Sequence, residues 1–173
     1  MFSNYVYFPL NIQINDNYMV TGCKGFNSVG CEVKIWDVRS NVKPVFTLLG
    51  HSQDVTDTML IKKDDRVLSV SKDGSIGLWS VLTGDKISWK HRNEQVYTCI
   101  ASGATTTTTT TTSTTNGSDE STNHIETVSI GSFDGSIHRF SLGSSSASKG
   151  ETEECDSTIT LISSTNPSHE SIQ

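Results

Sequence analysis

The stretch LSVSKDGSIGLWS, residues 68–80, reads as two short strands joined by a tight turn. Small and apolar residues flank KDGS, and the Asp-Gly pair at 73–74 offers the positive φ that a two-residue hairpin requires. Ser69 and Trp79 stand on the two strands, and His51 precedes Ser69 by 18 positions. Such a set of polar side chains indicates either an active site or a buried hydrogen-bond network.

Two further copies of this stretch lie on either side of it. EVKIWDV ends one copy around Trp36, and SIGLWSV ends the next around Trp79, 43 positions later. SIHRFSL places Phe140 at the matching position of a third copy, 61 positions after Trp79. Residues 102–123 are a low-complexity, threonine-rich insert. Removing this insert restores a period of ~40–45 residues, which is the period of a four-stranded propeller blade.

The repeats predict an all-β fold of about three blades, each with four antiparallel strands. Short β-favouring runs between turn residues place these strands. We expect them at 5–14, 18–23, 32–38, 44–49, 54–61, 66–71, 75–80, 86–90, 95–101, 125–131, 136–142 and 157–163. Within a repeat region of 1–142, the blades are expected to span 5–49, 50–90 and 91–142.

Two segments lack the composition of a packed core. The insert 102–123 is polar and repetitive, so we expect it to be an unstructured loop between two strands of a blade. Residues 143–173 are rich in serine and carry an acidic run at 151–156. We expect this second segment to be a mostly disordered, solvated tail.

The motifs resemble the WD-repeat family of β-propellers, over about residues 5–142. The second copy carries the Gly-His pair at 50–51, Ser69, the Asp-Gly pair at 73–74 and Trp79 at the spacing of that family. The resemblance implies propeller blades, and because such rings hold typically 4–8 blades, three would form an incomplete ring. We expect either a truncated propeller or one that other chains complete.

A narrower resemblance lies in the first copy. TGCKGFNSVGCEVKIWDVRS, residues 21–40, is similar to a segment in the C-terminal part of the family of WD repeat-containing protein thirty-one. In that family too, a glycine-rich loop and Gly-Cys-Glu precede the tryptophan strand.

In the WD-repeat family, His51, Ser69, Asp73 and Trp79 are expected to form a buried structural hydrogen-bond network. A buried indole N–H needs an acceptor, and a serine hydroxyl can both accept from Trp79 and bond to His51. The imidazole would then donate its other proton to Asp73. A serine hydrolase is the alternative that the pattern favours least, since its serine would have to be exposed beside oxyanion donors.

The other two copies vary this network. The first has Thr21 and Trp36 but no Asp-Gly pair, and the third has Ile130 and Phe140 in place of the serine and the tryptophan. A varied network suits a structural role better than an active site.

Composition excludes several classes of partner. A net charge of -6 with 13 Lys+Arg argues against nucleic acid, which requires a dense basic patch. No apolar run approaches the ~18–20 residues that cross a bilayer, so we expect no membrane insertion. Cys23, Cys31, Cys99 and Cys155 have no metal-ligand spacing, which predicts reduced thiols, no metal and no cofactor. We expect a soluble cytoplasmic protein, with the nucleus left open.

The fold resemblance favours a non-enzymatic protein-interaction scaffold. Partner-contacting side chains in the family flank the first strand of a blade and precede the turn aspartate. By position these are Asp54, Thr56, Lys72, Gln95, Tyr97 and Phe133. Phe133 precedes an Asp-Gly turn, where an aromatic ring suits an interface; the alternative is that it folds back over Tyr97.

Two other interactions are open at this stage. Trp36, Asp37 and Arg39 form a WDxR motif, which predicts as the alternative function a substrate receptor of a cullin-RING ubiquitin ligase. The edges of an incomplete ring also predict self-association, because unpaired strands and blade faces invite pairing.

Overall fold

The computed structural model describes residues 8–39, 43–61, 65–114, 117–143 and 159–165, and describes no side chains at 104–125. These residues form three four-stranded antiparallel sheets, which we call the first, second and third blades. The first blade contains β1 (Pro9–Ile14), β2 (Tyr18–Cys23), β3 (Val33–Asp37) and β4 (Phe46–Leu48). The second contains β5 (Val55–Ile61), β6 (Arg66–Ser71), β7 (Ser75–Ser80) and β8 (Lys86–His91). The third contains β9 (Tyr97–Thr114), β10 (Gly117–Ser132), β11 (Ile137–Gly143) and β12 (Ile159–Thr165).

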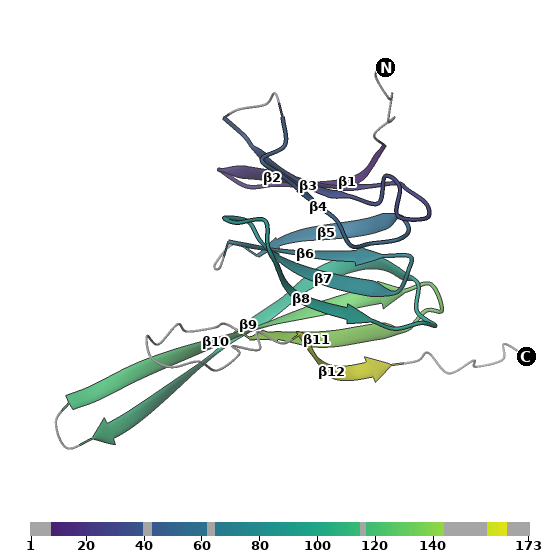
Figure 1. Cartoon of the computed structure of the whole chain (residues 1–173). Coiled ribbons are helices and arrows are strands. Elements are labelled where there is room, and N and C mark those ends of the chain that lie inside the picture. The colour runs from purple at the N-terminus through teal and green to yellow at the C-terminus, as the bar shows by residue number, and fades with distance from the viewer. Residues whose placement is uncertain (1–7, 40–42, 62–64, 115–116, 144–158, 166–173) are drawn as a thin grey trace, which may run out of the picture.

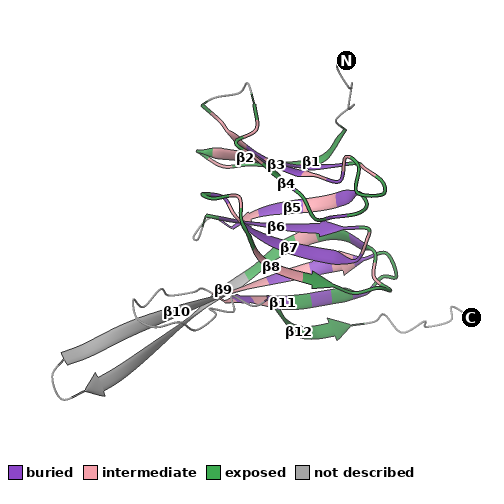
Figure 2. Ribbon diagram, viewed as in Figure 1, coloured by how far each residue is buried: buried purple, intermediate pink, exposed green. Residues whose placement is uncertain are grey.

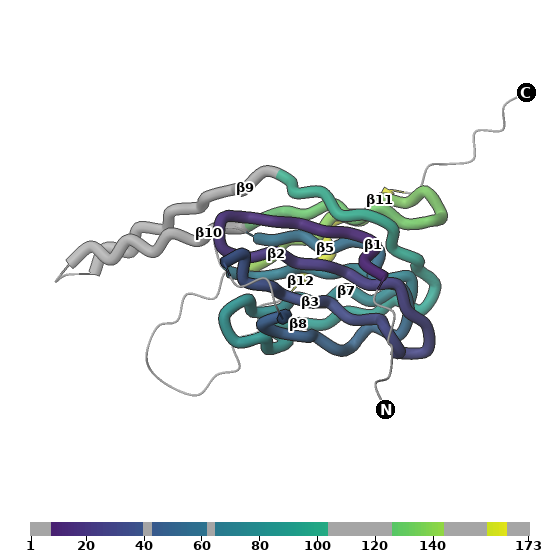
Figure 3. Tube along the Cα trace, turned by 90° about the horizontal axis from the view of Figure 1, so that it is seen from above, coloured from purple at the N-terminus to yellow at the C-terminus, as the bar shows by residue number. Residues whose placement is uncertain are grey.

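The three blades stack face to face as an open arc (Figure 1). In each blade the strands pair in chain order, so that neighbouring strands in the sequence are neighbours in the sheet. Seen from above, the sheets lie over one another (Figure 3). The all-β prediction of three four-stranded blades without a closed ring is confirmed.

Tight turns hold the two middle strands of the second and third blades in register. Gly74 and Gly135 have φ of 79° and 82°, a backbone conformation that glycine adopts without strain. The corresponding loop of the first blade is longer and ends in a small hairpin of its own. There the backbone N–H of Phe26 donates to the carbonyl of Val29 at 3.0 Å, and Val29 donates back at 3.0 Å. These turns lie at one end of the arc, which we call the turn-bearing end (right in Figure 1).

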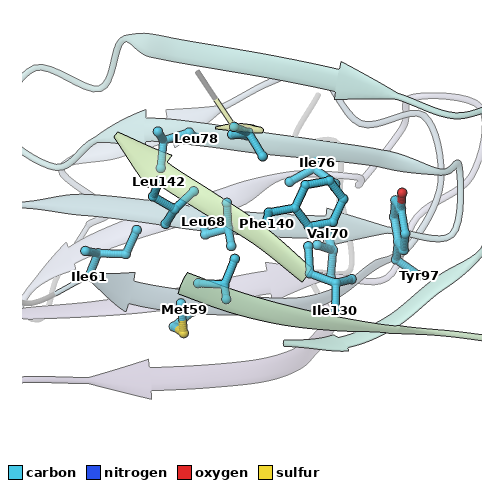
Figure 4. Packing of buried hydrophobic residues seen from close by; sticks show 12 residues of the cluster. Met59, Ile61, Leu68, Val70, Ile76, Leu78, Tyr97, Ile130, Phe140 and Leu142 are labelled. Atoms are coloured by element: carbon cyan, nitrogen blue, oxygen red, sulfur yellow. The ribbon is translucent and has the colours of Figure 1, made fainter. Parts of the chain in front are cut away.

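Two hydrophobic clusters fill the spaces between blades (Figure 2). Burial alternates from residue to residue along β11, whereas every residue of β6 is buried because a blade covers each side of its sheet. Between the first and second blades lie Val20, Val33, Ile35, Leu48, Val55, Val67, Trp79 and Val81. Between the second and third blades lie Met59, Ile61, Leu68, Val70, Ile76, Leu78, Tyr97, Val128, Ile130, Phe140, Leu142 and Ile159 (Figure 4). The second sheet therefore buries both of its faces, and the first and third sheets each bury one face against it.

Strands β9 and β10 differ from the prediction for the insert. Their antiparallel ladder continues from the pair Thr105–Glu126 to the pair Thr114–Gly117 and forms a two-stranded ribbon that projects from the arc (Figure 1). The prediction that 102–123 are unstructured is therefore wrong for the backbone that the structure describes. The physical reason is that threonine is β-branched and favours extended backbone, and the ladder satisfies the backbone groups without an apolar face.

The third blade also extends further than its expected boundary at 142. Ile159–Thr165 forms β12, which pairs with β11 and lies two residues beyond the expected strand at 157–163. The segment at 143–173 thus supplies the outer strand of a blade. Its other residues, including the acidic run and Cys155, lie outside the described residues, apart from Gly143.

Candidate functional site

A chain of buried hydrogen bonds crosses the second blade. The indole N–H of Trp79 donates to Ser69 Oγ at 2.8 Å, and Ser69 Oγ lies 2.8 Å from His51 Nε2. All three side chains are buried, with exposed fractions of 2%, 0% and 2%. Because the oxygen of Ser69 accepts from the indole, its hydroxyl proton is available to His51 Nε2, as the sequence predicts.

The other end of the chain differs from the prediction, because a second serine stands between His51 and Asp73. His51 Nδ1 lies 2.7 Å from Ser75 Oγ and 3.8 Å from Asp73 Oδ1. The prediction of a direct hydrogen bond between His51 and Asp73 is therefore wrong. Ser75 Oγ donates to Asp73 Oδ1 in a short contact. Its oxygen then accepts from His51 Nδ1–H, which assigns the proton of a neutral imidazole to Nδ1.

Asp73 also receives two backbone donors, Ser52 N–H at 2.6 Å and Ser75 N–H at 2.8 Å. Burial of this carboxyl raises its pKa, but the nearby His51 ring and the hydrogen bonds from Ser52 and Ser75 outweigh burial and hold the pKa far below its usual range. The carboxylate is therefore the charged anchor of the network, and it ties the segment entering the blade to the β6–β7 turn.

The geometry at Ser69 does not suit nucleophilic catalysis. Its oxygen accepts from Trp79, its proton faces His51, and its side chain has no exposed surface. A catalytic serine must reach a substrate carbonyl beside oxyanion donors.

The third blade carries a different polar network around the same kind of turn. Ser136 Oγ donates to Asp134 Oδ1 at 2.6 Å, and His138 Nε2 lies 2.8 Å from Ser136 Oγ and 2.9 Å from Gln95 Oε1. Since both partners accept, the proton of His138 sits on Nε2, and Nδ1 is buried without a partner among the described residues. Burial lowers the pKa of His138, and nearby Arg92 lowers it further.

Three of the expected partner-binding residues are engaged within the fold. Asp54 accepts from Lys72 Nζ at 2.7 Å and from the backbone N–H of Gly25 at 2.9 Å. Thr56 Oγ1 donates to the carbonyl of Tyr97 at 2.8 Å. Burial raises the pKa of Asp54, but the hydrogen bonds from Lys72 and Gly25 outweigh it and lower the pKa below its ordinary value. Lys72 is the most accessible of the three, with 49% of its side chain exposed.

Two further expected contact residues are held inside the third blade. Tyr97 is 0% exposed and lies edge-on to His138, with ring centroids 5.9 Å apart. Gln95 is half-buried and directs its Oε1 at His138. The prediction of Tyr97 as a surface contact is wrong because the ring is part of the cluster between the second and third blades.

Phe133 stands apart from the other expected residues because it is 82% exposed. Its backbone N–H donates to the carbonyl of Val96 at 2.8 Å, and Val96 is itself 36% exposed. The ring therefore does not fold back over Tyr97. It projects from the turn-bearing end.

The sequence analysis missed a second exposed apolar pair at this end. Phe26 and Val29, at the tip of the first blade's long loop, are 68% and 57% exposed. Phe26 also forms an isolated bridge with Gln53, and Ser28 N–H donates to the carbonyl of Ser52 at 3.0 Å. The signal that singled out Phe133, an aromatic residue at a turn tip, applies equally to Phe26.

The WDxR residues lie at the far end of β3. Trp36 Nε1 donates to Thr21 Oγ1 at 3.1 Å, which repeats the Trp79–Ser69 bond of the second blade. Arg39 binds Asp37 through two nitrogens, at 3.1 Å and 3.2 Å. Hydrogen bonds from Arg39 lower the pKa of Asp37.

Within the described ranges, no helix is long and apolar enough to span a bilayer. The same part of the chain contains no group of three or more His, Cys, Asp or Glu side chains placed to hold a metal ion. Cys23 and Cys31 are buried and Cys99 is exposed, and the cysteines that the structure describes form no disulfide.

Sequence comparison gives a distant relative. No protein-family model matches the chain. Over 73 residues, 42% of this chain, the sequence is 32% identical to pre-mRNA-processing factor 17 of mouse and of human. The chain covers 12% of the length of those two proteins.

Solved structures show the same fold. The C-terminal WD40 domain of Sif2 is similar at a TM-score of 0.54 and 16% identity, over 76% of this chain and 30% of that one. The computationally designed Ika8 protein is similar at 0.57 and 20% identity, over 91% and 36% of the two chains. The designed Ika4 protein is similar at 0.54 and 19% identity, over 92% and 81%. The three blades are thus WD40-like, and the arc holds no closed ring.

Proposed function

We propose that this chain is a non-enzymatic protein-interaction module that binds its partners at the turn-bearing end. WD40-type domains generally bind proteins, and the fold is typically non-catalytic. The observation that carries the proposal is Phe133, a large aromatic ring that is 82% exposed on a hydrogen-bonded turn. Aromatic anchors of this kind dominate the binding energy of many protein interfaces.

The turn under Phe133 is held by several hydrogen bonds. Ser132 N–H donates to the carbonyl of Ser136 at 2.9 Å, and Gly135 N–H donates to the carbonyl of Ser132 at 3.0 Å. Asp134 Oδ1 accepts from the backbone N–H of Ser136 at 2.9 Å. The hydrogen bonds from Ser136 lower the pKa of Asp134 to about 2. A ring displayed on a rigid turn loses little conformational entropy when a partner covers it.

A photo-cross-linking amino acid at position 133 tests the proposal in extracts of the source cell. Leu82 is the matched control, because it is 63% exposed in the β7–β8 turn at the opposite end of the arc. We expect a discrete protein adduct at 133 that unlabelled wild-type chain suppresses, and none at 82. Against the identified partner, Phe133→Ala should weaken binding roughly tenfold or more, and Leu82→Ala should not. Equal adducts at both positions would refute the assignment of this end.

The substrate-receptor function is the second candidate, and it rests on the motif of Trp36, Asp37 and Arg39. Arg39 supports it through its exposure, since 74% of its side chain is accessible. Its ion pair with Asp37 would have to open or be shared on binding. Purified ligase adaptor should bind the wild-type chain and lose roughly tenfold affinity for Arg39→Ala. Equal binding of the two would remove this candidate.

The narrower resemblance to the family of WD repeat-containing protein thirty-one stays a prediction, as does a cytoplasmic location with the nucleus left open. The net charge of -6 supports protein partners over nucleic acid.

A further inference from the structure

The outer strands of the second and third blades leave a groove between them. The two sheets meet more closely at their inner strands, β5 and β9, than at β8 and β12. The groove that opens between β8 and β12 has a volume of about 450 Å³, which is within the range of pockets that bind ligands. None of its lining residues belongs to the turn that carries Phe133, so the groove is separate from the partner site proposed at that turn.

The floor of the groove is apolar. It is formed by Ile76 and Phe140, which belong to the cluster between the second and third blades (Figure 4), and by Leu161 of β12. Leu161 pairs with Phe140, so the two side chains leave the third sheet on the side that meets the second blade. Leu161 is 38% exposed, and it is therefore the floor residue that a partner can cover.

The rim of the groove is cationic. Lys90 pairs with Ile76, which directs both side chains to the face of the second sheet that meets the third blade. Lys90 is exposed, and its ammonium group has no hydrogen bond or ion pair with the residues that the structure describes. Arg92 follows the end of β8 and also lines the groove, whereas the lining residues include no aspartate or glutamate. His91 lines it too, but its Nε2 lies 2.9 Å from the carbonyl oxygen of Asp73 and is bonded there.

The positive charge of Arg92 also acts on buried groups of the third blade. Burial raises the pKa of Tyr97 and lowers the pKa of His138, and Arg92 lowers both. Both of these side chains are buried, so Arg92 has surroundings in which water screens its charge less than at an open surface. A carboxylate in the groove would be attracted by the same charge.

We propose that this groove binds a short segment of a partner protein in which an acidic side chain stands beside a bulky apolar one. The carboxylate would lie between Lys90 and Arg92, and the apolar side chain would cover Leu161. A guanidinium can bind a carboxylate through two parallel charge-assisted hydrogen bonds, which a neutral amide of the same shape cannot replace.

The charge of the whole chain adds selectivity. The net charge is -6, so an acidic segment is repelled by most of the molecule and attracted at the cationic rim. Two cations above an apolar floor suit a protein segment better than nucleic acid, whose phosphates require a dense basic patch.

Fluorescence anisotropy of two labelled octapeptides with the whole chain tests the proposal. Both peptides have two leucines at their centre, and the flanking residues are glutamate in one and glutamine in the other. At ~0.15 M salt, we expect the glutamate peptide to saturate wild type below roughly 1 mM and to bind at least about tenfold tighter than the glutamine peptide. Lys90→Glu should weaken this binding about tenfold or more, and Leu161→Ser about threefold or more. Arg92→Gln serves as a second variant if Lys90→Glu does not give a folded spectrum by circular dichroism.

Matched controls separate the groove from general charge and exposure. Lys43→Glu removes an exposed cation that precedes β4 in the first blade. Ile162→Ser truncates a residue that is 55% exposed beside Leu161 but does not line the groove. Both variants should bind the glutamate peptide like wild type, and so should Phe133→Ala.

Four outcomes would overturn the proposal. Absence of binding by wild type up to roughly 1 mM, or equal binding of the two peptides, would mean that the groove does not recognise a carboxylate. Equal losses in Lys90→Glu and Lys43→Glu would show attraction to overall charge alone. Loss of binding in Phe133→Ala but not in Lys90→Glu would move the acidic segment to the turn-bearing end, and cross-linking at position 133 tests that end independently.

Discussion

The second and third blades each have a hydrogen-bond network at the turn between their middle strands, and the two networks use different side chains. In both, an aspartate at the turn between the middle strands is bonded by a serine two residues later, and that serine bonds a histidine. In the second blade the histidine, His51, belongs to the segment that enters the blade. In the third, His138 stands on β11 itself, and Gln95 of the entering segment meets it there.

The difference follows from which ring occupies the neighbouring position. His138 is equivalent to Gly77, and Phe140 is equivalent to Trp79. A Cβ at Gly77 would lie 2.7 Å from Trp79 Nε1, closer than real side chains approach. The indole therefore requires glycine at 77, whereas the smaller phenyl ring of Phe140 leaves room for a histidine. The position that supplies the histidine and the type of aromatic residue therefore change together, because the two side chains compete for the same space.

We expect the largest effect from Gly77→His, which gives the second blade the histidine of the third while keeping Trp79. The new side chain must displace the indole from Ser69, so we expect the free energy of unfolding to fall by about 3 kcal/mol. Urea unfolding followed by tryptophan fluorescence measures the change.

The double variant Gly77→His/Trp79→Phe is the matched control for that prediction, because it installs the complete third-blade pair. It should recover part of the loss, with a coupling of about 1 kcal/mol or more between the two positions. Additive losses would mean that the two positions do not share space in the way the structure indicates.

Ser69→Ala should have the next largest effect. It leaves the Trp79 N–H and His51 Nε2 without partners in a buried site, at a cost of about 2 kcal/mol. Thr21→Ala is the natural comparison, because Thr21 accepts from Trp36 at 3.1 Å but Trp36 is only half-buried. We expect it to cost less than half as much in the same urea experiment. Equal costs would show that the histidine adds nothing to the Trp79–Ser69 bond.

The strands could be predicted from the sequence because turn residues and β-favouring runs mark them without tertiary information. Val55–Ile61, Arg66–Ser71 and Ser75–Ser80 lie within one residue of their expected bounds for this reason. The ribbon of β9 and β10 could not be predicted from apolar content, because a backbone ladder of β-branched residues needs no buried face.

The site was predictable only where a motif kept its spacing. His51, Ser69 and Trp79 come together as expected. Ser75 was missed, although Asp-Gly-Ser-Ile recurs in the second and third copies at 73–76 and 134–137. His138 could not be found from the motif. It lies on β11, whereas His51 precedes the first strand of its blade, so His138 does not stand at the spacing of the motif. Tyr97 was assigned to the surface by position alone, and position along a strand does not reveal which side of the sheet a neighbour covers.

The two networks should also fail in different pH ranges. The pKa of His138 is lowered from 6.5, so below that pH the unfolded imidazole binds a proton that the folded one does not. The contribution of neutral His138 to the free energy of unfolding is therefore lost as the pH falls from about 7 toward the pKa of the folded state. The pKa of Asp73 is lowered from 3.8, so the second blade's contribution is present above 3.8 and is lost only at lower pH.

Urea midpoints measured from pH 8 to pH 3 should consequently fall in two steps. His138→Gln should remove the upper step. Asp73→Asn should reduce the lower step without removing it, because the pKa values of Asp54 and Asp134 are also lowered and these carboxyls titrate in the same acid range. A single step below pH 4 in wild type would mean that His138 is not buried as a neutral ring.

The smallest effect should come from Ser75→Ala, which removes the serine between His51 and Asp73. The carboxylate keeps its backbone donors from Ser52 and from residue 75, and His51 Nδ1 needs to move only from 3.8 Å into direct contact with Asp73 Oδ1. Because a direct charge-assisted bond replaces the bridged one, we expect a loss of about 1 kcal/mol or less, below that of Ser69→Ala. The ¹⁵N chemical shifts of the His51 ring should show the proton still on Nδ1. A loss as large as that of Ser69→Ala, or a proton moved to Nε2, would mean that the serine bridge itself sets the tautomer and that the network cannot close without it.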